Sequence, residues 1–150
     1  MILKSQTPST SPRGKNKTFI AVSIAALILA LLIGGYFVTT YLIQLREYKK
    51  RIADISITNV NLSKIPDGFY TGSYNAIMIA AKVRVDIADH NIQNITILYH
   101  KNERGKKAEI IVKEIKSAQS LNVDTITGAT NSSRVILKAV QNALDSGVKA

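Results

Sequence analysis

The sequence predicts an α+β protein in which a small, curved antiparallel sheet is packed with helices and preceded by one N-terminal transmembrane helix. Three observations support this fold class. Residues 18–45 carry no charged side chain, two stretches between residues 83 and 99 alternate apolar with polar residues, and two later stretches repeat apolar residues at helical spacing. The chain after residue 45 is long enough to bury a modest core without disulfides or metals.

The apolar stretch near the N-terminus is long enough to cross a bilayer. About 20 helical residues, each rising ~1.5 Å, span a ~30 Å hydrocarbon layer, and this stretch contains 28. The apolar part of a cleaved signal peptide is only about 7–15 residues long. We therefore expect an uncleaved anchor at residues 18–45, preceded by a disordered stub at residues 1–17 that is rich in Ser, Thr and Pro.

The charge distribution argues for a membrane and against nucleic acid as the partner. The formal charge is +10, but the residues up to Arg51 account for +7 of it and the remainder for only +3. Basic residues that flank an apolar helix suit anionic lipid headgroups. They lie on both sides of the apolar stretch, so the positive-inside rule does not decide the orientation, and only the small size of the leading segment favours a cytoplasmic N-terminus. The chain has no cysteine, which excludes disulfides, iron–sulfur clusters and thiolate zinc sites.

The segment after the anchor predicts a helical stalk. Apolar side chains recur there at intervals of three and four residues, at Leu42, Leu45, Tyr48, Ile52 and Ile55. A short self-association seam would have the same pattern. We interpret residues 46–64 as a stalk or linker and residues 65–150 as the domain, which is entered through a tight turn at Ile-Pro-Asp-Gly, residues 65–68.

Within the domain, a hairpin and two helices are expected. Residues 83–87 and 95–99 alternate in the manner of strands, with a turn at residues 89–91 between them. Residues 107–119 and 132–146 carry apolar residues at helical spacing, and Gly147 is expected to end the second helix. The charged loop at residues 101–107 suggests solvation and no site. The tyrosines Tyr70, Tyr74 and Tyr99 suggest core or rim positions, and His90 and His100 suggest polar surface.

The loop at residues 124–133 has features of a phosphate-binding helix start. Gly128 and Ala129 carry little or no side chain, so the backbone can approach a polar ligand, and Thr130 projects just after them. Asn131, Ser132 and Ser133 are candidate N-caps. The free N–H groups and the positive end of the helix dipole favour an anion at this point. An ordinary loop before a helix would use the same residue types, but the whole pattern from Asp to Thr is rare by chance, which favours a functional site.

Residues 65–144 resemble the FMN-binding domain family, whose members include covalently flavinylated subunits of sodium-pumping quinone reductases and ferredoxin-linked complexes. Two signatures carry the resemblance: Asp-Gly-Phe-Tyr-Thr-Gly at residues 67–72, and Asp-Thr-Ile-Thr-Gly-Ala-Thr at residues 124–130. The resemblance implies that a separate flavin transferase, which uses FAD and magnesium, joins the phosphate of FMN to the hydroxyl of Thr130. It also implies that Asp124 opens the recognised loop and that Thr127, Gly128 and Ala129 form it. Thr127 stands where many members have Ser.

The resemblance further implies a membrane-anchored electron carrier. In this family the transferase acts outside the cytoplasm, so the domain is expected to be extracytoplasmic, and the covalent FMN would relay electrons from a membrane donor to an acceptor. No catalytic residue or protein-bound metal is predicted. The alternatives are a flavin-dependent reductase that acts directly on a small molecule, and a structural or sensory membrane protein whose motif is unused.

Overall fold

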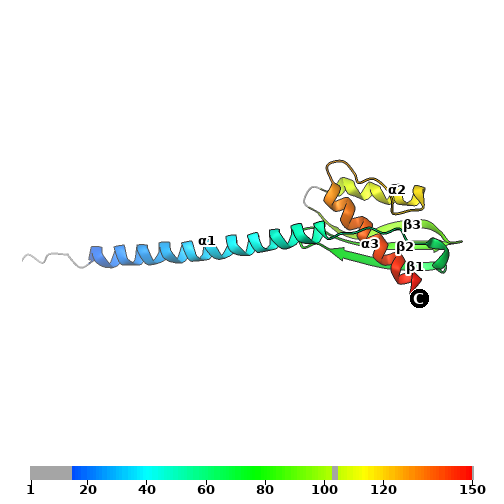
Figure 1. Cartoon of the computed structure of the whole chain (residues 1–150). Helices are drawn as coiled ribbons and strands as arrows, with labels where there is room; N and C mark the ends of the chain where they lie inside the picture. Colours follow the sequence, from blue (N-terminus) through cyan, green and yellow to red (C-terminus); the bar gives the residue numbers. More distant parts are fainter. Residues whose placement is uncertain (1–14, 103–104, 150) are drawn as a thin grey trace, which may run out of the picture. The chain divides into compact units, whose positions relative to one another are not determined.

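The computed structural model describes residues 15–102 and 105–149, and the chain divides into two compact units, Met1–Tyr41 and Leu42–Ala150. Figure 1 labels its main helices and strands. In chain order, the elements are α1 (Lys15–Ala53), the 3-10 helix η1 (Leu62–Lys64), β1 (Gly68–Asn75), β2 (Ala80–Ala88), β3 (Asn91–Lys101), the 3-10 helix η2 (Lys106–Ile110), α2 (Ile111–Ala118) and α3 (Thr130–Val148).

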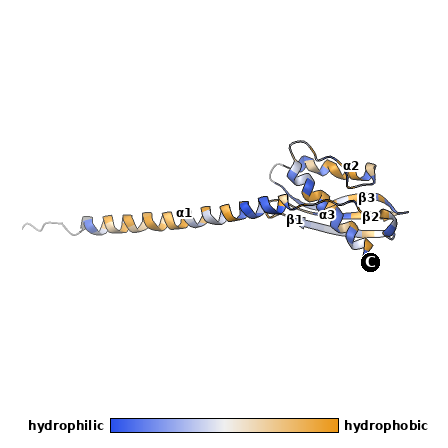
Figure 2. Cartoon of the chain, in the orientation of Figure 1, coloured by the Kyte–Doolittle hydropathy of each residue, from blue (hydrophilic) through white to orange (hydrophobic). Residues whose placement is uncertain are grey.

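The described part of the first unit is residues 15–41 of helix α1, and the remaining residues of this helix, 42–53, belong to the second unit. This helix is long and apolar enough to cross a membrane, with a mean hydropathy that reaches 2.5, and it is a candidate span by length and composition. Figure 2 shows the apolar residues along most of α1 and the polar residues at its C-terminal end. The stub predicted at residues 1–17 falls mostly outside the described residues, except that Lys15 and the two residues after it already belong to α1.

The second unit contains the predicted α+β fold and begins at Leu42, before the predicted domain start at residue 65. Its three strands form an antiparallel sheet in the order β1-β2-β3. The predicted hairpin is confirmed as β2 and β3, which are joined at Asp89 and His90, both with positive φ (51° and 58°). Two consecutive residues with positive φ match the twist of the flanking strands, which is why two-residue hairpin turns use this conformation.

A β-bulge changes which residues of β3 face the core. Val83 pairs with Ile97, but Lys82 pairs with Tyr99 and Ala81 with His100, so Leu98 is an extra residue. The apolar alternation of the sequence places Tyr99 on the same face as Ile97. In the structure, Tyr99 is exposed instead and the side chain of His100 is only 2% exposed. The expectation of a surface His100 was therefore wrong, because the bulge inverts the alternation.

Helix α3 covers one face of the sheet and approaches β1 very closely. A Cβ atom at Gly72 would overlap backbone atoms of Ala139 and Ala143 and would lie 2.8 Å from Ala143 Cα. Only glycine allows this approach. The helix begins at Thr130, two residues earlier than predicted, and continues through Gly147, so the expectation that Gly147 ends it was wrong. Gly147 is buried against Tyr70 and Ile65, where a larger residue would not fit.

The last turns of α1 and the segment after it pack on the domain. Ile52 and Ile55 are buried in its core, and Ile57, Val60 and Leu62 pack against that core. Side chains of α3 bind the backbone of this segment: Arg134 Nη2 donates to Ile55 O at 2.8 Å, Lys138 Nζ donates to Ser56 O at 3.0 Å, and Gln141 Oε1 accepts from Thr58 N at 3.3 Å. The apolar stripe predicted as a stalk is thus, at its C-terminal end, part of the domain core.

Candidate functional site

A buried serine fixes the loop that precedes α3. Ser133 is fully buried, and its Oγ accepts a hydrogen bond from Ile126 N (3.0 Å) and donates one to Ala129 O (3.0 Å). A further bond from Ala129 N to Ile126 O (2.9 Å) closes the turn. Gly128 lies inside this turn with φ of 73°, a conformation that favours glycine. These contacts hold the backbone of residues 126–130 in one shape.

The N-cap of α3 is Ala129, and no side chain caps the helix. The prediction that Asn131, Ser132 or Ser133 acts as the cap was therefore wrong. The backbone N–H groups of Thr130, Asn131 and Ser132 have no acceptor within the part of the chain that the structure describes. Three unpaired donors at the positive end of a 19-residue helix favour an anionic group close to this turn.

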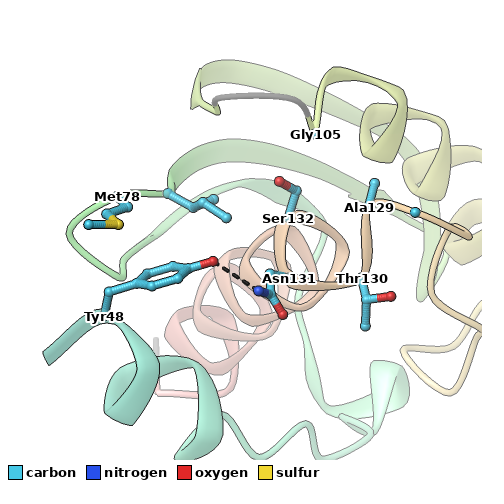
Figure 3. A pocket seen from close by; sticks show the side chains of 9 residues that line it. Tyr48, Met78, Gly105, Ala129, Thr130, Asn131 and Ser132 are labelled. Carbon is cyan, nitrogen blue, oxygen red and sulfur yellow. Dashed lines mark hydrogen bonds between the residues drawn. The ribbon is translucent and has the colours of Figure 1, made fainter. Parts of the chain in front are cut away.

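Thr130 is the first residue of α3 and is exposed. Its hydroxyl has no hydrogen-bond partner among the described residues. Figure 3 shows the side chain leaving the first turn with its hydroxyl directed away from Tyr48. Because the side chain is exposed and unpaired, no contact with a described residue has to break before the hydroxyl reacts. The hydroxyl is thus accessible for modification.

A cavity of about 510 Å³ opens beside Thr130 (Figure 3). One part of its wall is backbone and small polar side chains, and the other part is apolar. The lining residues are Tyr48, Met78, Ile79, Gly105, Gly128, Ala129, Thr130, Asn131 and Ser132. Tyr48 comes from α1, so a residue outside the predicted domain contributes to the site. Its place in the apolar stripe is the one sequence feature that relates it to the domain.

The structure does not place all predicted site residues at this cavity. Gly128, Ala129 and Thr130 line it, whereas Asp124 and Thr127 line a second, separate cavity of about 700 Å³ together with Glu114 and the residues between them. Asp124 and Thr127 are both exposed. The two parts of the motif therefore present different surfaces, one beside Thr130 and one on the outer side of the loop.

Lys107 is a functional candidate that the sequence interpretation missed. Its ammonium group lies over Gly128, where a Cβ atom would be only 2.7 Å from Lys107 Nζ. The loop at residues 101–107 suggested only solvation, because nothing in the sequence relates η2 to a loop twenty residues later. The structure brings a cation to within two residues of Thr130.

The buried side chain of His100 connects β3 to η2, the short helix that contains Lys107. Its Nδ1 atom lies 3.0 Å from Glu109 Oε1 in η2. Its Nε2 atom is buried and has no partner in the described part of the chain. Just before η2, Gly105 is packed against the Ser132 side chain, whose Cβ would be 2.7 Å from a Cβ at position 105. These contacts hold Gly105 and η2 beside the start of α3.

The tyrosines have different surroundings. Tyr70 and Tyr74 pack against the core, as predicted, and their hydroxyls donate to Pro66 O at 2.8 Å and Arg51 O at 3.1 Å. Tyr99 is exposed and lies outside the cavity. Of these three, none lines the cavity, and the tyrosine that does is Tyr48, which no signature includes.

A comparison with protein families identifies the domain. Residues 78–145 match the model of the FMN-binding domain. The match includes the signature at residues 124–130, and it begins after the one at residues 67–72. In a comparison with curated proteins, no sequence matched the chain. The family match and the apolar helix fit a membrane-anchored flavoprotein, and the matched residues 78–145, which include Thr130, are similar to the FMN-binding domain family.

Proposed function

We propose that this protein is a membrane-anchored flavoprotein that carries FMN in phosphoester linkage to Thr130 and relays electrons from a membrane donor to an acceptor. The observation that carries the proposal is the position of Thr130. It is an exposed, unpaired hydroxyl residue at the N-terminus of α3, within the residues that match the FMN-binding domain.

The surroundings of Thr130 fit a phosphate. The unpaired N–H groups of residues 130–132 can donate to phosphate oxygens, and the helix dipole adds to the attraction. The ammonium group of Lys107, which lies over Gly128, brings a positive charge to the same turn. A phosphodiester keeps one negative charge, so these groups stabilise the modified residue more than the free threonine.

The cavity fits the rest of the cofactor. Its volume of about 510 Å³ lies within the ~300–1,000 Å³ range of small-molecule sites. A flavin has a flat aromatic ring with polar edges, and Tyr48, Met78 and Ile79 give the cavity an apolar wall next to the polar turn. When bound, FMN supplies the redox chemistry, since it takes up and releases electrons singly or in pairs.

The attachment itself requires a partner. In the proposed reaction a flavin transferase uses FAD as the donor: the bond between Thr130 Oγ and the FMN phosphorus forms, the phosphoanhydride bond of FAD breaks, AMP leaves, and the hydroxyl proton is released. Asp124 and Thr127 are exposed on the outer side of the loop, where a transferase can contact them. Gly128 and Ala129 add no large side chain of their own beside Thr130.

We further propose that residues 18–45 anchor the protein and that the N-terminus is cytoplasmic and the domain extracytoplasmic. Covalent attachment suits this location, because a freely exchanging cofactor would be lost outside the cytoplasm. The chain has no cysteine, so single cysteines introduced as Ser5→Cys and Lys149→Cys report on each side of the anchor. A membrane-impermeant maleimide applied to intact cells should label only Lys149→Cys, and labelling of Ser5→Cys instead would reverse the proposed orientation.

Intact-mass measurement after co-expression with a flavin transferase tests the linkage. Wild-type protein should gain one FMN as a phosphoester, Thr130→Ser should retain the adduct, and Thr130→Ala should lose it. Thr71→Ala, which removes another exposed threonine hydroxyl from β1, is the matched control and should be modified as the wild type is. An unmodified wild type, or an adduct that survives Thr130→Ala, contradicts the proposal.

Electron relay is separated from direct reduction by the behaviour of the reduced holoprotein. A carrier should exchange electrons with quinols, reductases or other redox proteins and should reduce small organic acceptors only slowly. Steady turnover of a small organic acceptor at enzymatic rates would favour the alternative, a flavin-dependent reductase.

A further inference from the structure

The C-terminal turns of α1 are fixed to the domain beside the cavity. Arg51 Nη1 donates to Asn75 O at 3.0 Å, and Arg51 O accepts from the Tyr74 hydroxyl at 3.1 Å. Ile52, one helical turn after Tyr48, is 7% exposed and belongs to the domain core. Residues four apart lie on the same face of a helix. Tyr48 is therefore held against the domain by the same contacts that hold Ile52.

The hydroxyl of Tyr48 is oriented by the residue next to Thr130. Asn131 Nδ2 donates to Tyr48 Oη at 2.9 Å, the dashed contact in Figure 3. The oxygen accepts this bond, so the hydroxyl hydrogen remains free to donate. It has no acceptor among the described residues. The half-buried ring of Tyr48 thus lies at the cavity with a free hydroxyl donor. It is hydrogen-bonded to Asn131, the residue that follows the proposed attachment residue.

A strained loop presents the apolar side chains next to Tyr48. Ile77 has φ of 70°, which is rare for a β-branched residue. Two contacts hold it there: Ile77 N donates to Asn75 Oδ1 at 2.7 Å, and Lys101 Nζ donates to Ile77 O at 2.8 Å. Met78 and Ile79, the next two residues, line the cavity. Backbone strain that is held by several contacts is frequent at ligand sites.

Tyr48 and Met78 lie on one side of the cavity and Ala129 and Thr130 on the other (Figure 3). The cavity therefore has a phosphate-binding end and an aromatic, apolar end, which matches the two ends of a flavin nucleotide. Tyrosine rings stack on aromatic ligands, and the methionine thioether also makes favourable contacts with aromatic rings. Tyr48 lies thirty residues before the stretch that matches the family model.

We infer that the C-terminal end of the apolar helix is part of the flavin site: the isoalloxazine ring packs against Tyr48 and Met78, and the Tyr48 hydroxyl, positioned by Asn131, donates a hydrogen bond to the ring's polar edge. This inference rests on the proposed function. It adds that the helix which anchors the protein also supplies a cofactor-binding residue, so the flavin is in direct contact with that helix.

The test uses the full chain in detergent, with flavin fluorescence and affinity as the measurements. Tyrosine in contact with a flavin quenches its emission by electron transfer, and phenylalanine and leucine do not. We expect brighter flavin emission from the flavinylated Tyr48→Phe and Tyr48→Leu variants than from wild type, at equal adduct mass. For the unmodified chain titrated with free FMN, we expect Tyr48→Leu to raise Kd about tenfold, equivalent to about 1.4 kcal/mol, and Tyr48→Phe to raise it less.

The matched controls are Tyr99→Phe and Tyr99→Leu, because Tyr99 is exposed and outside the cavity. They should leave emission and Kd unchanged. Tyr48→Phe removes only the hydroxyl and keeps the packed ring, so it should fold as the wild type does. Far-UV circular dichroism checks the folding of each variant. Unchanged emission and Kd in both Tyr48 variants overturn the inference even when the Thr130 adduct is present. If the wild type gains no adduct but binds free FMN with an emission that depends on Tyr48, only the proposed linkage is overturned. If the chain neither gains the adduct nor binds free FMN, both the linkage and the inference are overturned.

Discussion

The two signatures of the chain, residues 67–72 and residues 124–130, differ in what their residues contact. In the first, Gly72 lies against the α3 backbone, and the Tyr70 hydroxyl bonds to Pro66 O. In the second, Thr130 is exposed and unpaired, and only Gly128 has a conformational requirement. The first signature packs the domain, and the second leaves the hydroxyl of Thr130 exposed and unpaired. Substitutions in the first should therefore change stability, and substitutions in the second should change modification.

Gly72→Ala should have the largest effect on stability. The added methyl would overlap the backbone of Ala139 and Ala143, so α3 must move away from β1. We expect a loss of about 3 kcal/mol, the upper part of the range for overpacked cores, measured by urea unfolding followed through tyrosine fluorescence. The control is Gly34→Ala, because a Cβ at Gly34 meets no atom within 4 Å. Equal stability of the two variants would contradict the packing role of this signature.

Ser133→Ala should have the second-largest effect on stability, and it should also lower the modification of Thr130. The variant removes the acceptor of Ile126 N and the donor to Ala129 O at a fully buried position. Leaving a buried donor unpaired costs about 1–3 kcal/mol. The loop before Thr130 should also loosen, so the yield of flavinylated protein should fall in the same intact-mass assay. Ser146→Ala, which removes a hydroxyl bonded to Ala143 O near the other end of α3, should leave that yield unchanged; an equal fall would refute the role of Ser133 in the loop.

Tyr70→Phe should lower stability by about 1 kcal/mol, the usual net value of one hydrogen bond, because it removes only the contact with Pro66 O. Urea unfolding measures the change. Tyr99→Phe is the control, since Tyr99 is 55% exposed and its hydroxyl has no partner among the described residues. Flavinylation should be normal in both variants. A loss of the adduct in Tyr70→Phe would mean that the first signature also serves the cofactor.

Thr130→Ala should have the smallest effect on stability and the largest on modification. The side chain is exposed and unpaired, so the free energy of unfolding of the unmodified chain should change by less than about 0.5 kcal/mol. Urea unfolding of protein expressed without the transferase measures this value. A large destabilisation would show that Thr130 is a structural residue, and the contrast between the signatures would then fail.

The fold could be predicted where the spacing of apolar residues along the sequence follows the face of the element that is buried. The hairpin of β2 and β3 and the helix α3 follow from their apolar patterns, because each has one face on a core. The pattern failed at His100, since a one-residue bulge at Leu98 inverts the faces and leaves no signal in the sequence. It failed at Gly147 for a different reason: glycine permits both a helix end and a close contact, and composition does not distinguish them.

The site could be predicted in part. The motif identified the turn of Gly128, Ala129 and Thr130 at the start of a helix, because small residues, a hydroxyl and helix signals are local features. Tyr48 and Lys107 could not be found, since each reaches the turn only through tertiary packing. An apolar stripe such as the one containing Tyr48 indicates that a helix face is covered. The stripe does not indicate which part of the molecule covers the helix face. Here the C-terminal end of the stripe is covered by the domain itself.

The conformation of Ile77 places a limit on how far this domain can be stabilised without changing its cavity. A non-glycine residue in the left-handed region costs about 1–2 kcal/mol, and Ile77 has φ of 70°. Replacement by glycine would relieve that steric clash but would free the backbone next to Met78 and Ile79. Selection for thermal tolerance and selection for a rigid cavity wall therefore oppose each other at this position, and a trade-off between stability and activity is expected here.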